Sequence, residues 1–103
     1  MADGAYRNDA YLASCPVQSD QRVAILTSNR LMLIRTRPLA LEWQEPFTEI
    51  QTIKAEMTGI AIYLRSMSWE PFLVITDKNR RESFFKNIED AVVKYNANRR
   101  PSL

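Results

Sequence analysis

Residues 23–34 read VAILTSNRLMLI, two short apolar runs on either side of a polar centre. Asn29 and Arg30 stand between the runs, and Asn tolerates the positive φ that a tight two-residue turn requires. Short runs of aliphatic and β-branched residues around such a turn are typical of paired strands. The stretch therefore predicts a β-hairpin with strands over residues 22–28 and 31–36. Pro38 ends the second strand because it cannot donate a ladder hydrogen bond.

The same pattern extends outward from this hairpin over residues 9–77. Apolar segments alternate with turn residues at intervals of about eight to twelve residues, which indicates an antiparallel sandwich or barrel. Leu39, Leu41 and Trp43 alternate with polar residues and are expected on one face of the fourth strand. The other predicted strands are residues 11–16, 50–57, 60–65 and 69–76, with a polar loop at 17–21 and a corner at 46–48.

The period changes after the last predicted strand. Apolar residues then recur at intervals of three and four, which predicts an amphipathic helix of about four turns. Asp77 or Asn79 is expected to cap its start, and Arg99, Arg100 and Pro101 to end it. The apolar stripe consists of Phe84, Phe85, Ile88, Ala91, Val92 and Tyr95. The fold class expected from the whole chain is mainly β, with seven strands and one C-terminal helix.

Length and composition limit the chain to one domain. With 103 residues there is room for a single core, expected over residues 10–98, between a flexible segment at 1–9 and a tail at 99–103. No stretch approaches the roughly 20 apolar residues that cross a bilayer, and the polar N-terminus does not resemble a signal peptide. A lone cysteine, Cys15, fits a reducing compartment, so a cytoplasmic location is expected. Whether Met1 is the native start or the first residue of an excised piece stays open.

The residue inventory argues against catalysis. The chain has no histidine, one cysteine and two glycines, which excludes histidine acid–base chemistry, a cysteine zinc cage and a glycine-rich phosphate loop within it. Its carboxylate pairs are interpreted as solvated surface charges. We therefore expect that the protein is not an enzyme and that it binds neither a metal nor a cofactor. A net charge of only +2 argues against nucleic acid as a partner, and the isolated domain is expected to be a monomer.

Two motifs carry a resemblance to a known family. The run at residues 23–34, followed by LEWQEPFTEI at 41–50, is similar to the "strand, Thr-x-x-Arg, strand, Trp-x-x-Pro-Phe-x-x-Ile" pattern of pleckstrin-homology-like and GRAM domains. Within that group the chain most resembles the C-terminal domain of the chorein family, the vacuolar protein sorting proteins that bridge organelles and transfer lipid. The resemblance covers about residues 11–98.

This resemblance implies a fold and a role. The fold would be a bent, pleckstrin-homology-like sheet of seven strands whose open corner is plugged by the C-terminal helix. The role would be that of a non-catalytic, membrane-targeting adaptor of a very long lipid-transfer protein, peripheral at organelle membranes or contact sites. Its partners would be a small GTPase of the Arf class, phosphoinositide-containing membrane, or both. The alternative is a scaffolding domain that packs against neighbouring domains and binds no lipid.

Four arginines form the candidate headgroup site: Arg22, Arg35, Arg37 and Arg65. In the expected strand order, three loops gather at the open end of the sheet and carry these guanidinium groups together, as a site for anionic headgroups would require. The alternative is that they are strand ends whose stems cover apolar surface. The loop at residues 17–21 lacks the basic run of strong phosphoinositide binders, so weak and salt-sensitive membrane binding is expected.

Met67 and Trp69 form a second candidate, an apolar loop tip beside Arg65 that would enter the headgroup region of a membrane. The alternative is that Trp69 begins a buried strand and only Met67 is exposed. Trp43 and Phe47 are interpreted as core residues, with the lining of a protein-binding groove as the other possibility.

Overall fold

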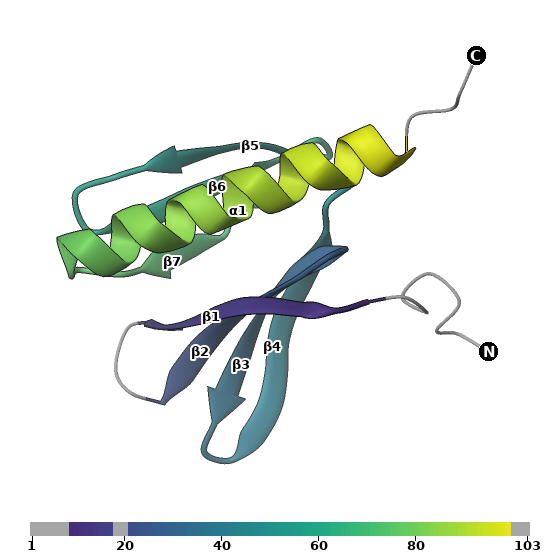
Figure 1. Ribbon diagram of the computed structural model, residues 1–103. Helices are drawn as coiled ribbons and strands as arrows, with labels where there is room; N and C mark the ends of the chain where they lie inside the picture. Colours follow the sequence, from purple (N-terminus) through teal and green to yellow (C-terminus); the bar gives the residue numbers. More distant parts are fainter. Residues whose placement is uncertain (1–8, 18–20, 100–103) are drawn as a thin grey trace.

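The computed structural model describes residues 9–17 and 21–99, and it consists of seven strands followed by one helix (Figure 1). The mainly β fold with a C-terminal helix that the sequence predicts is confirmed. Three predicted segments lie mostly outside the described residues: the N-terminal segment at 1–9, the loop at 17–21 and the C-terminal tail at 99–103. The elements are β1 (Tyr11–Val17), β2 (Arg22–Thr27), β3 (Arg30–Thr36), β4 (Leu39–Pro46), β5 (Ile50–Ala55), β6 (Gly59–Leu64), β7 (Phe72–Val74) and α1 (Lys78–Arg99).

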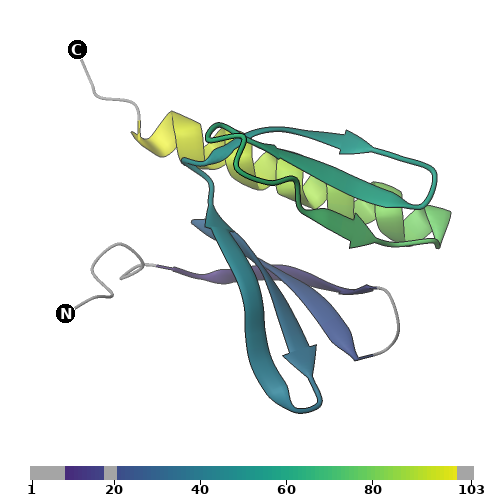
Figure 2. The ribbon, with the colours of Figure 1, turned by 180° about the vertical axis from the view of Figure 1, so that it is seen from behind.

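The strands form two antiparallel sheets joined by the corner after β4. The first sheet has the order β1-β2-β3-β4 and the second β5-β6-β7. Figures 1 and 2 show α1 lying along one face of the second sheet and passing over β1, while the β3–β4 turn projects away from the helix. The ends of β3 and β4 at this turn are therefore the part of the first sheet farthest from the rest of the fold.

The core lies between the two sheets and the helix. It takes alternate residues from β2 and β3, which is the period expected of a sheet with one buried face. Phe47, at the corner between the sheets, is 1% exposed and meets the Tyr95 ring edge-to-face at 5.5 Å. The interpretation of Phe47 as a core residue is confirmed. The buried apolar residues include Ala24, Leu26, Leu31, Leu33, Ile60, Ile62, Leu64, Leu73, Phe84, Ile88 and Ala91.

Helix α1 is longer than the apolar stripe predicts, with 22 residues rather than about four turns. Of the two expected caps, Asp77 is the one used: its Oδ1 accepts a hydrogen bond of 3.0 Å from the Arg80 backbone N–H, as an N-cap does. The Arg81 guanidinium donates to the carbonyl oxygens of Ile75 and Thr76 at 3.0 and 3.3 Å. That arginine therefore holds the entry into the helix and is not a free surface cation.

Two strand predictions are wrong, and backbone chemistry explains both. In β4 a register shift places Trp43 opposite the buried Leu33 but Leu41 opposite Ile34 on the other face, so Leu39, Leu41 and Trp43 do not share one face. The last strand covers only residues 72–74 instead of 69–76. Pro71 has no N–H for a ladder, and its carbonyl instead accepts a hydrogen bond of 3.0 Å from Ile62.

Candidate functional site

Three of the four candidate arginines gather at one end of the first sheet. Arg22 opens β2 and stands directly opposite Arg35 near the end of β3. Arg37 follows in the turn between β3 and β4, and its side chain is exposed. The hairpin predicted from residues 23–34 places these charges together because antiparallel pairing brings the start of β2 beside the end of β3.

A carboxylate lies between two of these arginines. Glu42 Oε1 accepts from Arg22 Nε at 3.0 Å, and its Oε2 lies 3.5 Å from both Arg22 Nη2 and Arg35 Nη1. The hydrogen bond from Arg22 lowers the pKa of Glu42 below its usual value, with the charges of Arg22 and Arg35 acting in the same direction. Arg35 also donates to the Pro38 carbonyl at 3.4 Å. The cluster of three cations and one anion keeps a net positive charge.

Arg37 and Leu39 form the exposed tip of this end. Among the described residues, no hydrogen bond or ion pair to the Arg37 side chain is found. Leu39 is 79% exposed, the result of its place beside the turn at the free end of β4. Sequence reasoning placed Leu39 on a strand face and overlooked it as a site residue, although its position two residues after Arg37 is the signal that would have found it.

The structure does not bring Arg65 to this cluster. Its Nε donates to the Thr48 carbonyl at 3.1 Å, and its backbone N–H donates to the Glu49 carbonyl at 2.8 Å, beside the corner where β4 ends. The length of β4, roughly 25 Å at about 3.3 Å per residue, separates that corner from the β3–β4 turn. The expectation of four converging guanidinium groups is therefore wrong for Arg65, because the β6–β7 loop lies beside the β4–β5 corner.

Met67 and Trp69 differ from each other in that loop. Met67 is 84% exposed with a positive φ of 57°, whereas Trp69 is 44% exposed and precedes the short β7. The Trp69 indole N–H donates to Glu45 Oε2 at 3.1 Å, and its ring meets the partly buried Trp43 edge-to-face at 5.6 Å. Trp69 is thus neither the start of a strand nor a free side chain, and Trp43 packs at the margin of the core.

The outward side of the first sheet is unexpectedly apolar. We call the outer face the surface formed by Val23, Ile25, Met32, Ile34 and Leu41, which register pairing places together on the side away from the core. The first four are partly exposed and Leu41 is 49% exposed. An antiparallel sheet open to water on one side normally alternates apolar and polar residues. The unbroken runs at residues 23–26 and 31–34 are the sequence signal for this face, which our sequence reasoning overlooked.

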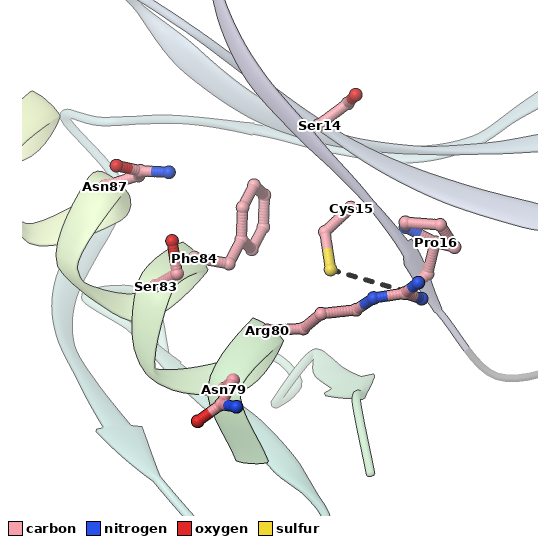
Figure 3. A pocket seen from close by; sticks show the side chains of 8 residues that line it. All are labelled: Ser14, Cys15, Pro16, Asn79, Arg80, Ser83, Phe84 and Asn87. Carbon is pink, nitrogen blue, oxygen red and sulfur yellow. Dashed lines mark hydrogen bonds between the residues drawn. The ribbon is translucent and has the colours of Figure 1, made fainter. Parts of the chain in front are cut away.

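A cavity of about 410 Å³ lies between β1 and the first turns of α1 (Figure 3). Cys15 faces it from β1, and its thiol donates to the Pro16 carbonyl at 3.4 Å. Burial raises the pKa of the Cys15 thiol, an effect that the Arg80 charge opposes, and this favours the protonated form. The cavity is lined by Ser14, Cys15, Pro16, Asn79, Arg80, Ser83, Phe84 and Asn87.

Two further kinds of site are absent from the described ranges, 9–17 and 21–99. No three side chains of the metal-ligating types cluster there. Helix α1 is not long and apolar enough to cross a membrane.

Comparison with known proteins identifies a matching family model and a similar protein. Residues 1–79 match the family model described as "Intermembrane lipid transfer protein VPS13, C-terminal". Over 94 residues the chain is 31% identical to the intermembrane lipid transfer protein VPS13 of Chaetomium thermophilum. That match covers 91% of this chain but only 3% of the relative. The family model spans most of the chain and agrees with the chorein resemblance of the two motifs, so the chain belongs to the C-terminal family of VPS13 intermembrane lipid transfer proteins.

Proposed function

We propose that this domain is a non-catalytic adaptor that attaches an intermembrane lipid transfer protein to its target membrane as a peripheral component. The observation that carries this proposal is the β3–β4 tip, where Arg37, without a partner among the described residues, and the 79% exposed Leu39 lie close to Arg22 and Arg35. A cation beside an exposed apolar side chain suits the boundary between lipid headgroups and acyl chains.

The strength of this contact follows from its charges. Each cation near an anionic leaflet contributes about 1 kcal/mol, an attraction that salt screens. Glu42 offsets part of it, because its carboxylate engages Arg22 and Arg35. Membrane binding therefore depends on the negative charge of the membrane more than on the stereochemistry of the headgroup. Phosphoinositides contribute to it through their negative charge. Such a contact is weak and reversible alone, and stable residence takes a second attachment.

A small GTPase of the Arf class is the protein partner proposed for that second attachment. The motif resemblance supports this choice, and the weakness of the lipid contact gives the reason that a second one is needed. The test is retention of the domain on immobilised GTPase loaded with GTP or with GDP. Retention that depends on GTP supports this partner, and equal or absent retention contradicts it.

Met67 and Trp69 stay a prediction as membrane-inserting residues. Met67 is exposed enough for that role, but Trp69 would first have to leave Trp43 and Glu45. Arg65 also stays a predicted headgroup ligand, at a different end of the fold from the other three arginines. The variants below separate the two ends.

The scaffolding alternative has its own supporting observation, the apolar outer face. Isolated domains seldom expose a contiguous apolar patch of more than a few hundred Å² without a partner. A domain that serves only to pack against neighbours would leave such a face when isolated and would show no affinity for vesicles. The vesicle experiment therefore distinguishes this alternative from the membrane adaptor.

Sedimentation with phosphatidylcholine vesicles containing phosphatidylserine tests the membrane contact. We expect the variant Arg35→Glu/Arg37→Glu to bind more than tenfold more weakly, since it reverses two charges worth about 1 kcal/mol each. Arg65→Glu, the same charge change at the other end, should bind nearly as wild type. Vesicles with phosphoinositide at equal total charge should bind equally well.

Three results would contradict this site. One is a loss of vesicle binding in Arg65→Glu as large as the loss in Arg35→Glu/Arg37→Glu. Another is vesicle binding that does not weaken when salt is added. The third is wild-type protein that stays in the supernatant with anionic vesicles, which would favour scaffolding. Circular dichroism of each variant checks that the fold is intact.

A further inference from the structure

The outer face lacks a covering layer among the described residues. A sheet that is apolar on both sides normally lies between two layers of structure. Here the second sheet and α1 cover only the inner side, and the partly buried residues that pack against the core do not include Val23, Ile25, Met32, Ile34 or Leu41. The aliphatic side chains of this face are therefore available for contact with another molecule.

The charges around the face differ between its two ends. At one end Arg30 is paired with Asp9 at 3.0 Å and donates to Gln44. At the other end, Arg22 and Arg35 share the carboxylate of Glu42, and Arg37 has no partner among the described residues, so this end keeps a positive charge. No described strand position on this face carries an acidic residue. One end is thus neutral and the other positive, which favours an occupant with acidic residues toward the β3–β4 turn.

The size of the face argues against a second copy of the chain. Only five side chains form it, four partly exposed and Leu41 49% exposed, whereas each partner contributes roughly 20–30 residues to a stable interface. A stable interface buries about 800 Å² on each partner. The three strands that carry this face, spaced about 4.8 Å apart, span roughly 10 Å, which matches one α-helix of about 10 Å diameter.

We propose that the outer face binds one amphipathic α-helix of a partner protein. The helix has a stripe of leucine or isoleucine at i, i+3, i+4 and i+7, and acidic residues at the end that lies beside Arg37. This contact goes beyond the proposed membrane attachment and does not require it, because its apolar part uses the sheet face and only its acidic end reaches Arg37 at the β3–β4 tip. Its test contains no lipid, so either proposal can fail without the other.

The probe is a fluorescent 18-residue helical peptide with that stripe and with glutamates in its last turn, titrated into the isolated domain and followed by anisotropy. One control peptide has the same composition in an order without the stripe, and another carries lysines in place of the glutamates. The domain variant is Ile25→Thr/Ile34→Thr, which keeps β-branched side chains and strand propensity. Val93→Thr, a matched change at a helix position that is 68% exposed, is the control variant.

We expect saturable binding of the striped acidic peptide, with NMR shift changes confined to β2, β3 and β4. The Ile25→Thr/Ile34→Thr variant should bind at least tenfold more weakly, Val93→Thr should bind as wild type, and the lysine peptide should bind several-fold more weakly. Equal binding of the reordered peptide would overturn the proposal, as would no saturable binding. A concentration-dependent dimer with shift changes at the same strands, seen by sedimentation velocity and NMR without peptide, would also overturn it and identify a second copy as the occupant.

Discussion

The β3–β4 turn and the β6–β7 loop have similar sequences but different environments. In each, an arginine is followed two residues later by an apolar side chain that is about four-fifths exposed: Arg37 with Leu39, and Arg65 with Met67. Yet Arg65 is hydrogen-bonded to a carbonyl and the same loop carries Trp69, held by Trp43 and Glu45. Among the described residues, nothing holds the side chain of Arg37.

The comparison shows that position in the fold decides what a basic and apolar loop can do. The β6–β7 loop lies at the corner between two sheets, where carbonyl groups and aromatic rings are within reach. The β3–β4 turn projects beyond the sheet (Figure 1). A cation without an intramolecular partner is available for a ligand, whereas a paired one must first break its bonds. Four predictions test this difference, from the largest effect to the smallest.

Replacing Trp69 should cost stability, whereas replacing Leu39 should not. Trp69→Ala removes an edge-to-face aromatic contact and an indole hydrogen bond to a carboxylate, which together contribute about 2 kcal/mol. Leu39→Ala, at an exposed strand end, should change the free energy of unfolding by less than about 0.5 kcal/mol. Urea unfolding of the two variants measures both. Equal stability losses would mean that the two loops are not distinguished by their contacts.

Replacing Leu39 should instead affect membrane binding. Leu39→Ser should reduce binding to anionic vesicles about tenfold, since a leucine that enters the interface contributes on the order of 1.5 kcal/mol. Met67→Ser is the matched control, because Met67 is also exposed but lies in the β6–β7 loop. If Met67→Ser causes the larger loss of vesicle binding, as measured by sedimentation, then Met67 is the residue that inserts into the membrane.

Removing the Glu42 charge should strengthen the same contact. Glu42→Gln keeps the size of the side chain but frees Arg22 and Arg35 from a carboxylate, and one charge near the membrane contributes about 1 kcal/mol, or roughly a fivefold gain in binding. Glu45→Gln removes a carboxylate that accepts from Trp69 instead. An equal gain in both variants would indicate a nonspecific effect of net charge.

The smallest effect is the titration of Glu42 itself. Its pKa in the folded protein is lowered by Arg22, so its ion pair stabilises the fold above the ordinary value of 4.5 and loses that contribution as the pH falls through the lowered pKa. Carbon-detected NMR should show a Glu42 midpoint below 4.5 that rises in Arg22→Gln and is unchanged in Arg65→Gln. A midpoint that does not respond to the Arg22 substitution would remove Glu42 from this cluster.

Local patterns in the sequence predict much of the fold. The two strands of the hairpin around Asn29 are correct because neighbouring strands pair locally, but its turn differs from the expected one, since Arg30 already belongs to β3 and Asn29 does not adopt a positive φ. The helix is correct in place because its stripe recurs at the helical period and because Asp77, one of the two expected caps, begins it. The predicted boundaries of β7 and the predicted faces of β4 are less accurate. Pro71 shortens β7, and a bulge shifts the register of β4, and neither changes the hydrophobic pattern of the sequence.

The candidate site was predictable in part. The grouping of Arg22 with Arg35 follows from pairing within one hairpin, which the sequence determines. The placement of Arg65 depends on how one sheet lies against the other, and no local pattern carries that information. The outer face was visible as two unbroken apolar runs, but only the register of β2, β3 and β4 shows that their outward residues form one surface.

By itself, the sequence determined seven strands, one helix, the hairpin that gathers three arginines, and the family to which the chain belongs. These depend on turn residues, on side-chain periods and on motifs, all of which are local. Only the tertiary structure decided that Glu42 engages two of those arginines and that Arg65 and Trp69 are held at a corner. It also decided that Leu39 is exposed and that Arg37 has no partner in the part of the chain that the structure describes. The physical reason is that a charged or aromatic side chain takes its role from its partners, and those partners come from strands far apart in the chain.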